Sequence, residues 1–223
     1  MHGTWAYTLR PGHDPIAVVP VFLRGKTQSV QKAKQAAKRK GVDELKRTIL
    51  NPIFNDTVTF VQTCAESNGR ITDIEVTLMP KGRNVLHCHA YTEKFTAIDG
   101  DLGLENEKKQ QKILKGGESY IVEPMAWHCF FNPTDREIRF GVQLEPGNER
   151  FEYFLRILYG LAADGLTDKK SRPKSIKHAA ILLNMADAKM TGLLSLMSPL
   201  LKGVAKKAKA NGDEQTLIHK YCV

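Results

Sequence analysis

Several features are absent from this 223-residue sequence, and each absence narrows the class of protein. The four cysteines form no CxxC pair, and a chain of this size needs no disulfides to fold. No window holds the roughly eighteen uncharged apolar residues that a membrane-spanning helix requires. The N-terminus shows no secretory signal pattern, and neither a phosphate loop nor a nucleotide fingerprint occurs. We therefore expect a soluble cytoplasmic protein.

Positive charge is concentrated at the two ends of the chain. Residues 1–48 carry ten basic against three acidic side chains, and residues 151–223 carry twelve against six. Residues 49–150 carry eleven against fifteen, which is a mildly acidic balance. This distribution argues against nucleic-acid binding by the central region.

The first 48 residues are predicted to form a basic N-terminal arm. Irregularly spaced prolines and glycines over residues 1–26 favour an extended chain. Residues 29–40 (SVQKAKQAAKRK) are rich in helix formers but have few large apolar side chains to bury. We favour a solvated, marginal helix or part of a disordered arm there, and lysine contacts with nucleic acid or an anionic surface are the less favoured alternative.

Short segments rich in β-branched and aromatic residues dominate the middle of the chain. They alternate apolar with polar residues, are separated by turn residues, and have no helices between them. This pattern predicts a mainly β fold, an antiparallel β-barrel or jelly roll over residues 49–150. The predicted strands are 58–64, 71–79, 95–99, 112–115, 119–123, 128–132 and 138–144.

A helical C-terminal extension is predicted over residues 151–223, where the apolar period changes from two to about three and a half. The first helix begins near Phe151 and stops at Gly165. The second begins near Pro173 and continues towards residues 191–192. The third is predicted to start at Pro199, with Ser198 as its cap, and to end near Gly212.

Four side chains in the predicted barrel form a candidate metal site. His87 and His89 share one face of a strand because strand side chains alternate, and Glu93 has the same parity. His128 would reach them from a strand that pairs across the barrel. Three imidazoles and one carboxylate suit a single mid-series divalent ion, and an octahedral ion would keep two positions open. A barrel without metal is the alternative.

These residues carry a resemblance to the cupin superfamily. The segment HCHAYTEKFTAIDG over residues 87–100 resembles the first cupin motif, G(X)5HXH(X)3–4E(X)6G, although the leading Gly82 is one residue too close. Gly117, His128 and Asn132 follow the spacing of the second motif, G(X)5PXG(X)2H(X)3N. Segments that flank the barrel are also similar to a bacterial group of single-domain cupins.

The sequence departs from the second motif at two turn positions. Glu123 stands where the motif has proline, with Pro124 next to it, and Met125 stands where the motif has glycine. These changes affect the backbone of a turn and leave the ligands intact. Glu123 is read as a turn residue at the barrel rim, with a role as a pocket acid as the alternative.

The resemblance implies one divalent ion per chain, with Fe, Mn, Ni, Zn and Cu all compatible with histidine and carboxylate ligands. It implies a metal-dependent, dioxygenase-like oxidoreductase acting on a small organic substrate, with Glu93 as a candidate base. A non-catalytic barrel that binds metal or a small ligand is one alternative. An isomerase or lyase at the same ion is another.

A largely apolar pocket is expected beside the ion, formed by inward-facing strand positions and two aromatic residues at its mouth. For each of these residues a place in the core is the favoured interpretation, and contact with substrate is the alternative. Cys88 and Cys129 have the opposite parity and are expected to be small buried residues. The predicted pocket residues are Tyr91, Phe95, Ala97, Trp127, Phe130 and Asn132.

The C-terminal segment offers an apolar patch for a partner. Leucines and methionines over residues 193–204 precede Lys206, Lys207 and Lys209. Packing on the barrel or on a second subunit, as a homodimer, is the favoured interpretation. Peripheral contact of this helix with an anionic membrane surface is the alternative.

Overall fold

A computed structural model describes residues 46–190 and 193–223, although the side chains of 193–198 are not included. The predicted basic arm and its helix therefore lie outside the described residues, apart from the last residues of the arm. The described residues belong to one compact unit that extends from Glu44 to Val223.

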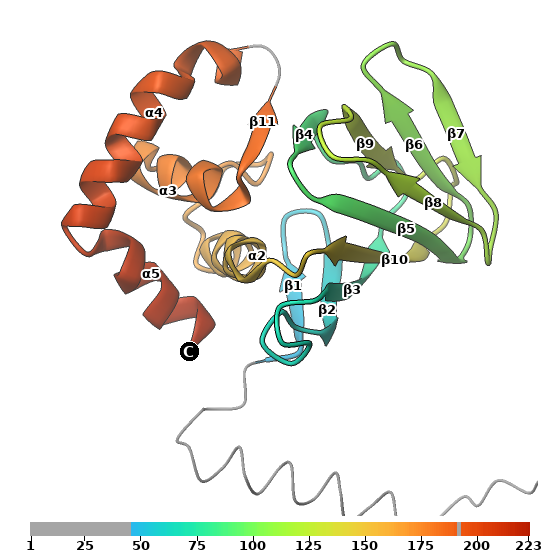
Figure 1. The fold of residues 1–223 in the computed structure, drawn as a ribbon, viewed down its shortest axis with the longest axis horizontal. Helices are drawn as coiled ribbons and strands as arrows, with labels where there is room; N and C mark the ends of the chain where they lie inside the picture. Colours follow the sequence, from blue (N-terminus) through green and yellow to red (C-terminus); the bar gives the residue numbers. More distant parts are fainter. Residues whose placement is uncertain (1–45, 191–192) are drawn as a thin grey trace, which may run out of the picture. The chain divides into compact units, whose positions relative to one another are not determined.

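Two antiparallel sheets form the mainly β, jelly-roll part of the chain that the sequence predicted (Figure 1). The first sheet has the order β1-β2-β3-β10-β5-β8, and the second has the order β11-β4-β9-β6-β7. Alternating burial along β2, β3 and β10 places every second side chain in the core. The strands are β1 (Thr48–Asn51), β2 (Asp56–Gln62), β3 (Thr72–Leu78), β4 (His87–His89), β5 (Thr92–Asp99), β6 (Leu102–Asn106), β7 (Gln111–Leu114), β8 (Ser119–Val122), β9 (His128–Phe131), β10 (Ile138–Glu145) and β11 (Ala188–Met190).

The core of the jelly roll is filled with large apolar side chains from both sheets. Phe60, Phe95 and Phe140 are at most 1% exposed and come from β2, β5 and β10. Leu102 and Leu114 come from β6 and β7 in the other sheet and are equally buried. These residues join the two sheets into one packed interior.

Four helices in the described part of the chain follow β10, with β11 between the second and third of them: α2 (Glu149–Ala163), α3 (Ile176–Ala186), α4 (Leu193–Ala210) and α5 (Asp213–Cys222). The side chain of Asn148 accepts a hydrogen bond from the Phe151 backbone N–H at 3.1 Å and caps α2. Leu155 and Tyr159 of α2 pack into the jelly-roll core, whereas Ile157 and Leu161 pack against α3 and α5. Helix α2 therefore joins the sheets to the other helices.

The second and third helices differ from their predicted limits. Helix α3 ends at Ala186 because Asp187 adopts a left-handed conformation with φ of 47°, and the next residues leave the helix as β11. Helix α4 begins at Leu193 and contains Pro199 in its interior, so the prediction of a start at Pro199 was wrong. The good helix formers Leu196 and Met197 precede this proline, Leu200 and Leu201 follow it, and the helix continues through it.

Part of the predicted apolar patch packs within the extension. Leu201 and Ala205 of α4 are buried against Ala180 of α3, whereas Leu200 is 60% exposed. None of the helices in the described part of the chain is long and apolar enough to cross a membrane.

Candidate metal centre

The four predicted ligands converge between three strands of the jelly roll. His87 and His89 lie on β4, Glu93 lies on β5 and His128 begins β9. One ligand atom from each of the four residues can be chosen so that all lie within 4.8 Å of one another. The strand register explains part of this geometry, because His87 pairs directly with His128. The group could hold a metal ion.

Each imidazole is fixed by a hydrogen bond from its outer nitrogen. Nδ1 of His87 donates to the Val85 carbonyl at 2.9 Å, and Nδ1 of His128 donates to the Ala126 carbonyl at 2.9 Å. His89 is held in the same way by the Tyr91 carbonyl at 3.0 Å. A carbonyl oxygen only accepts, so each Nδ1 carries the hydrogen and each neutral ring keeps its lone pair on Nε2.

The Glu93 carboxylate lies against two of these Nε2 atoms. Its Oε2 is 2.8 Å from Nε2 of His89 and 2.9 Å from Nε2 of His128. Lone pairs at these distances repel unless a proton or a cation lies between them. Ligand atoms about 2.1 Å from a shared ion lie about 3 Å apart when they meet it at right angles. The donor set therefore fits a single divalent ion.

Burial and neighbouring charges both shift the pKa values of these groups. Burial raises the pKa of the Glu93 carboxyl, but the close approach of the His128 and His89 imidazoles outweighs burial and lowers the pKa to about 2. Burial, reinforced by neighbouring His128, lowers the pKa of His87 to about 4. His128 differs: burial would lower its pKa, but the Glu93 carboxylate outweighs burial and raises it. An ionised carboxylate and a neutral His87 are the forms that bind a metal.

Aromatic rings support the ligands from behind. Tyr91 stacks on the His89 ring with a centroid distance of 3.8 Å and an interplanar angle of 7°. Phe95 meets the His128 ring edge-on at 5.9 Å. Both are buried residues of the jelly-roll core. They restrict the rotation of the two imidazoles that contact Glu93.

The other predicted pocket residues occupy different places. Phe95 and Ala97 are at most 1% exposed, and Phe130 packs partly buried against the same core. Asn132 is buried, and its amide donates to the carbonyls of Leu78 at 3.1 Å and Arg136 at 2.7 Å. Asn132 thus ties the turn after β9 to the end of β3.

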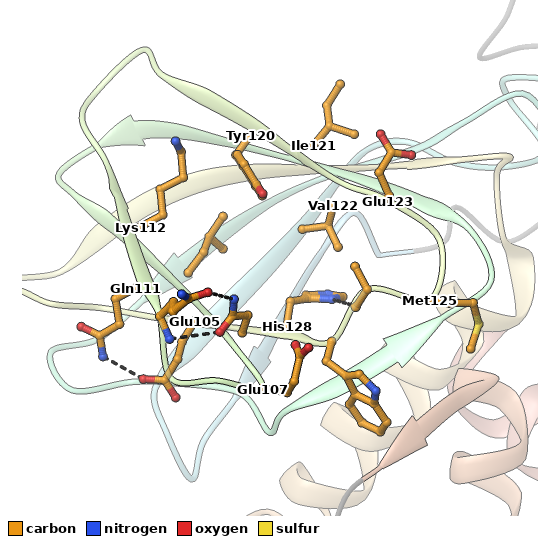
Figure 2. A pocket seen from close by; sticks show the side chains of 15 residues that line it. Glu105, Glu107, Gln111, Lys112, Tyr120, Ile121, Val122, Glu123, Met125 and His128 are labelled. Carbon is orange, nitrogen blue, oxygen red and sulfur yellow. Dashed lines mark hydrogen bonds between the residues drawn. The ribbon is translucent and has the colours of Figure 1, made fainter.

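A pocket of about 400 Å³ lies beside His128 (Figure 2). It contains Trp127 and His128 from the predicted set, and its walls come from β6, β7, β8 and the loop before β9. Its lining is more polar than the sequence led us to expect, since β6 and β7 and the turn between them supply several charged and amide side chains. The polar lining residues are Glu105, Asn106, Glu107, Gln110, Gln111, Lys112 and Glu123.

Sequence reasoning did not find this polar wall. The side chain of Glu105 bonds to Arg83 at 3.1 Å and to Gln111 at 2.7 Å, so its charge is balanced locally. Lys112 lies over the Tyr120 ring at 5.1 Å from the centroid. The charge of Glu107 and Lys112 was visible in the sequence, but β6 was not predicted, so the pairing of β6 with β7 was missed.

The turn before His128 has the backbone shape that the second motif requires. Met125, at the glycine position of the motif, has φ of 67°, in the left-handed region that favours glycine. Its backbone N–H donates to the His89 carbonyl at 2.7 Å. The turn therefore connects the His128 segment to β4 despite the substitution, at the cost of local strain.

The cysteines beside the ligands are buried, as predicted. Cys88 and Cys129 are at most 1% exposed, and both are free thiols. Cys129 accepts a hydrogen bond from Arg83 at 3.3 Å. The His87 and His128 rings point into the cluster of candidate ligands, while the side chains of the two cysteines point away from it.

Comparison with known proteins identifies the domain that holds this site. The family model described as "Cupin domain" matches residues 74–144, so the chain contains a small cupin domain. No curated protein matches the chain significantly.

Solved structures with partial similarity include three bacterial proteins. The polyketide cyclase RemF from Streptomyces resistomycificus is 16% identical, with a TM-score of 0.38 over 47% of this chain and 70% of its own. An RmlC-like cupin from Shewanella frigidimarina is 14% identical, with a TM-score of 0.40 over 49% and 96%. A double-stranded β-helix protein from Klebsiella pneumoniae is 20% identical, with a TM-score of 0.36 over 40% and 76%.

Proposed function

We propose that this cupin domain binds one divalent metal ion and acts as a dioxygenase-like oxidoreductase on a small organic substrate. His87, His89 and His128 would hold the ion through Nε2, and Glu93 would hold it through a carboxylate oxygen. The observation that carries the proposal is the shared orientation of the imidazoles. All three donate Nδ1–H to a backbone carbonyl, which leaves three Nε2 lone pairs around one buried carboxylate.

An ion with four such ligands and an octahedral preference keeps two positions open, and it supplies Lewis-acid and redox chemistry to a small molecule there. The protein holds the ligand rings in place through the carbonyls and through Tyr91 and Phe95. The low pKa of Glu93 makes its carboxylate a weak proton acceptor. This favours the ligand role of Glu93 over the role of a base.

The pocket beside His128 is the proposed place for the substrate. Its volume of about 400 Å³ suits a small organic molecule. Leu104, Val122 and Trp127 would contact apolar parts of the substrate, while Glu107 and Lys112 would contact polar groups.

A non-catalytic ligand-binding or metal-binding barrel is the second candidate. The interior next to the site is filled by Phe95, Ala97 and Phe140, which are at most 1% exposed. A filled interior limits how deeply a substrate enters and favours a role in which the ion stabilises the fold. An isomerase or lyase reaction at the same ion is the third candidate.

Elemental analysis of the purified protein, together with the His128→Ala variant, tests the metal site. We expect about one divalent ion per wild-type chain and a loss of metal in the variant. His219→Ala is the matched control, because His219 is an exposed histidine of α5. An unchanged metal content in His128→Ala would contradict the four-ligand assignment.

Oxygen consumption by the metal-loaded protein, across a panel of small phenols and diketones, separates the three candidates. Consumption that depends on one compound supports the oxidoreductase. Conversion of a compound without consumption of oxygen supports the isomerase or lyase. A metal-loaded protein that leaves every compound unchanged supports the non-catalytic barrel.

The homodimer and the peripheral membrane contact of the C-terminal helix stay predictions. Leu200 of α4 is 60% exposed and is the observation that supports either contact. Light scattering without detergent measures the first. Sedimentation with anionic vesicles at low and high salt measures the second.

A further inference from the structure

Strand β4 carries two of the four proposed ligands, yet the rest of the jelly roll holds it by few backbone contacts. Towards β9, only His87 forms a register pair, with His128. The His89 carbonyl accepts one further hydrogen bond, from the Met125 N–H. A three-residue strand with so few partners does not by itself fix two imidazoles in position.

The opposite side of β4 is paired along its whole length by β11. Ala188 lies opposite His89, Lys189 opposite Cys88 and Met190 opposite His87, in an antiparallel register. Figure 1 shows β11 beside β4 at the edge of the second sheet. This strand belongs to the helical extension and lies well beyond residues 74–144, which match the cupin domain.

Strand β11 is held in place by the helices. It directly follows α3, whose Ile181 and Met185 are fully buried against Ile157 and Leu161 of α2. Helix α2 is in turn packed into the jelly-roll core through other residues. A continuous series of packed elements therefore runs from the core, through α2 and α3, to β11 and the ligand strand.

The extension reaches the ligands by a second route, through aromatic rings. Phe151, in the first turn of α2, meets Tyr91 at a centroid distance of 6.5 Å with the rings 63° apart. Tyr91 stacks on the imidazole of His89. Phe151 therefore supports, through one intervening ring, the ligand that β11 supports through the backbone.

We propose that the helical extension is a positioning part of the metal centre. Strand β11 fixes the backbone of His87 and His89, and Phe151 fixes the His89 ring through Tyr91. The inference rests on the proposed metal-binding function. Groups that orient metal ligands without touching the ion change metal affinity by about 10- to 100-fold, because small displacements of the ligands matter.

Proline substitutions in β11 test the backbone route. Successive N–H groups along a strand point to opposite sides, so one of Ala188→Pro and Lys189→Pro removes a donor that faces β4. We expect that variant to bind metal about 10- to 100-fold more weakly, as measured by competition with a chelator. Lys189→Ala keeps the backbone donor and should bind like the wild type.

The electron paramagnetic resonance spectrum of the copper-loaded protein is the second readout. We expect the affected proline variant to change the nitrogen hyperfine pattern, because the imidazoles of His87 and His89 shift relative to the ion. A variant that only lowers stability would keep the wild-type spectrum in its folded fraction. Circular dichroism and thermal unfolding establish that fraction.

Phe151→Leu tests the aromatic route. If both proline variants fail to fold, this variant alone tests whether the helical extension positions the ligands. We expect a several-fold loss of affinity and an altered copper spectrum. Tyr153→Leu is the control, because it removes a ring of α2 that packs against the helix cluster, and it should bind metal like the wild type. Folded variants with wild-type affinity and spectrum would overturn the proposal. A wild-type protein that takes up no divalent ion would instead overturn the proposed function.

Discussion

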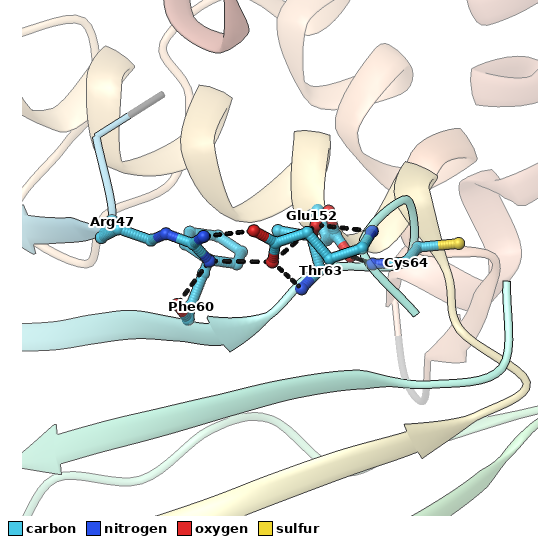
Figure 3. Close-up of polar contacts among 6 residues, drawn as sticks. Arg47, Phe60, Thr63, Cys64 and Glu152 are labelled. Atoms are coloured by element: carbon cyan, nitrogen blue, oxygen red, sulfur yellow. Dashed lines mark hydrogen bonds and ion pairs between the residues drawn. The ribbon is translucent and has the colours of Figure 1, made fainter. Parts of the chain in front are cut away.

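Glu93 and Glu152 are buried to the same extent, and their surroundings give them opposite properties. Each residue is 6% exposed to solvent. Glu93 lies on β5 between histidines, whereas Glu152 lies on α2 and faces the polar groups where the helix meets the sheets (Figure 3). Burial alone would raise the pKa of both carboxyl groups.

The groups that contact each carboxylate cause the difference in pKa. His128 and His89 overcome the effect of burial and lower the pKa of Glu93. Glu152 accepts from the Thr72 hydroxyl at 2.7 Å and the Cys64 backbone N–H at 2.6 Å, and burial still raises its pKa. Neighbours that can become positively charged favour a charged carboxylate that can bind a cation, whereas neutral donors suit a carboxyl group that connects structural elements.

The same substitution in both residues provides the sharpest test of this comparison. Glu93→Gln removes the only negative ligand, so we expect metal affinity to fall about 100-fold or more. Glu152→Gln should stay within a few-fold of the wild type. Chelator competition measures both, and similar affinities of the two variants would remove the distinction.

Glu152→Ala should lower the stability of the fold more than the Thr72 substitutions do. The Thr72 hydroxyl and the Cys64 N–H lose their buried acceptor, and a cavity forms, which lowers the free energy of unfolding by about 2–4 kcal/mol. Urea unfolding of the metal-free protein measures it. The exposed Glu149, also in the first turn of α2, gives a control variant, Glu149→Ala, expected within about 0.5 kcal/mol of wild type.

Thr72→Val should lower the free energy of unfolding less than Glu152→Ala does. Thr72 is fully buried, and its hydroxyl donates to Glu152 and accepts from the Asn148 backbone N–H at 3.0 Å. Loss of the hydroxyl should lower the free energy of unfolding by about 1–2 kcal/mol. Thr72→Ser keeps the hydroxyl, so a larger loss in Thr72→Ser than in Thr72→Val would assign the effect to packing.

The smallest expected effect is the contribution of Glu152 to the pH dependence of stability. The pKa of Glu152 is higher in the folded state than the ordinary 4.5, so the folded state holds its proton longer and stability falls as pH rises above 4.5. Glu152→Gln removes this dependence. Its free energy of unfolding relative to wild type should therefore increase from pH 4 to pH 7, and a constant or decreasing difference would contradict the raised pKa.

The cluster of candidate metal ligands could be predicted because side-chain alternation and motif spacing can be read directly from the sequence. The alternation of side chains places His87 and His89 on one face, and the motif spacing adds Glu93 and His128. The jelly-roll class followed from short alternating segments, although their limits shifted by a few residues.

Other features depend on contacts between distant segments. The three residues of β11 have no strand signature of their own and become a strand only by pairing with β4. The partners of Glu152 lie 80 and 88 residues away in the sequence. The polar pocket wall required knowledge that β6 pairs with β7. No local pattern specifies these pairings.

The position of β11 in the chain also affects when the site is completed during protein synthesis. Strand β4 is translated early, but its neighbour β11 is made only after residues 90–187. At about 5–20 residues per second, ribosomal synthesis of that segment takes roughly 5–20 s. During this interval the nascent chain has all four proposed ligand side chains once residue 128 is made, but β4 still lacks one neighbouring strand. Tight binding of the proposed metal ion should therefore come late in the maturation of the protein.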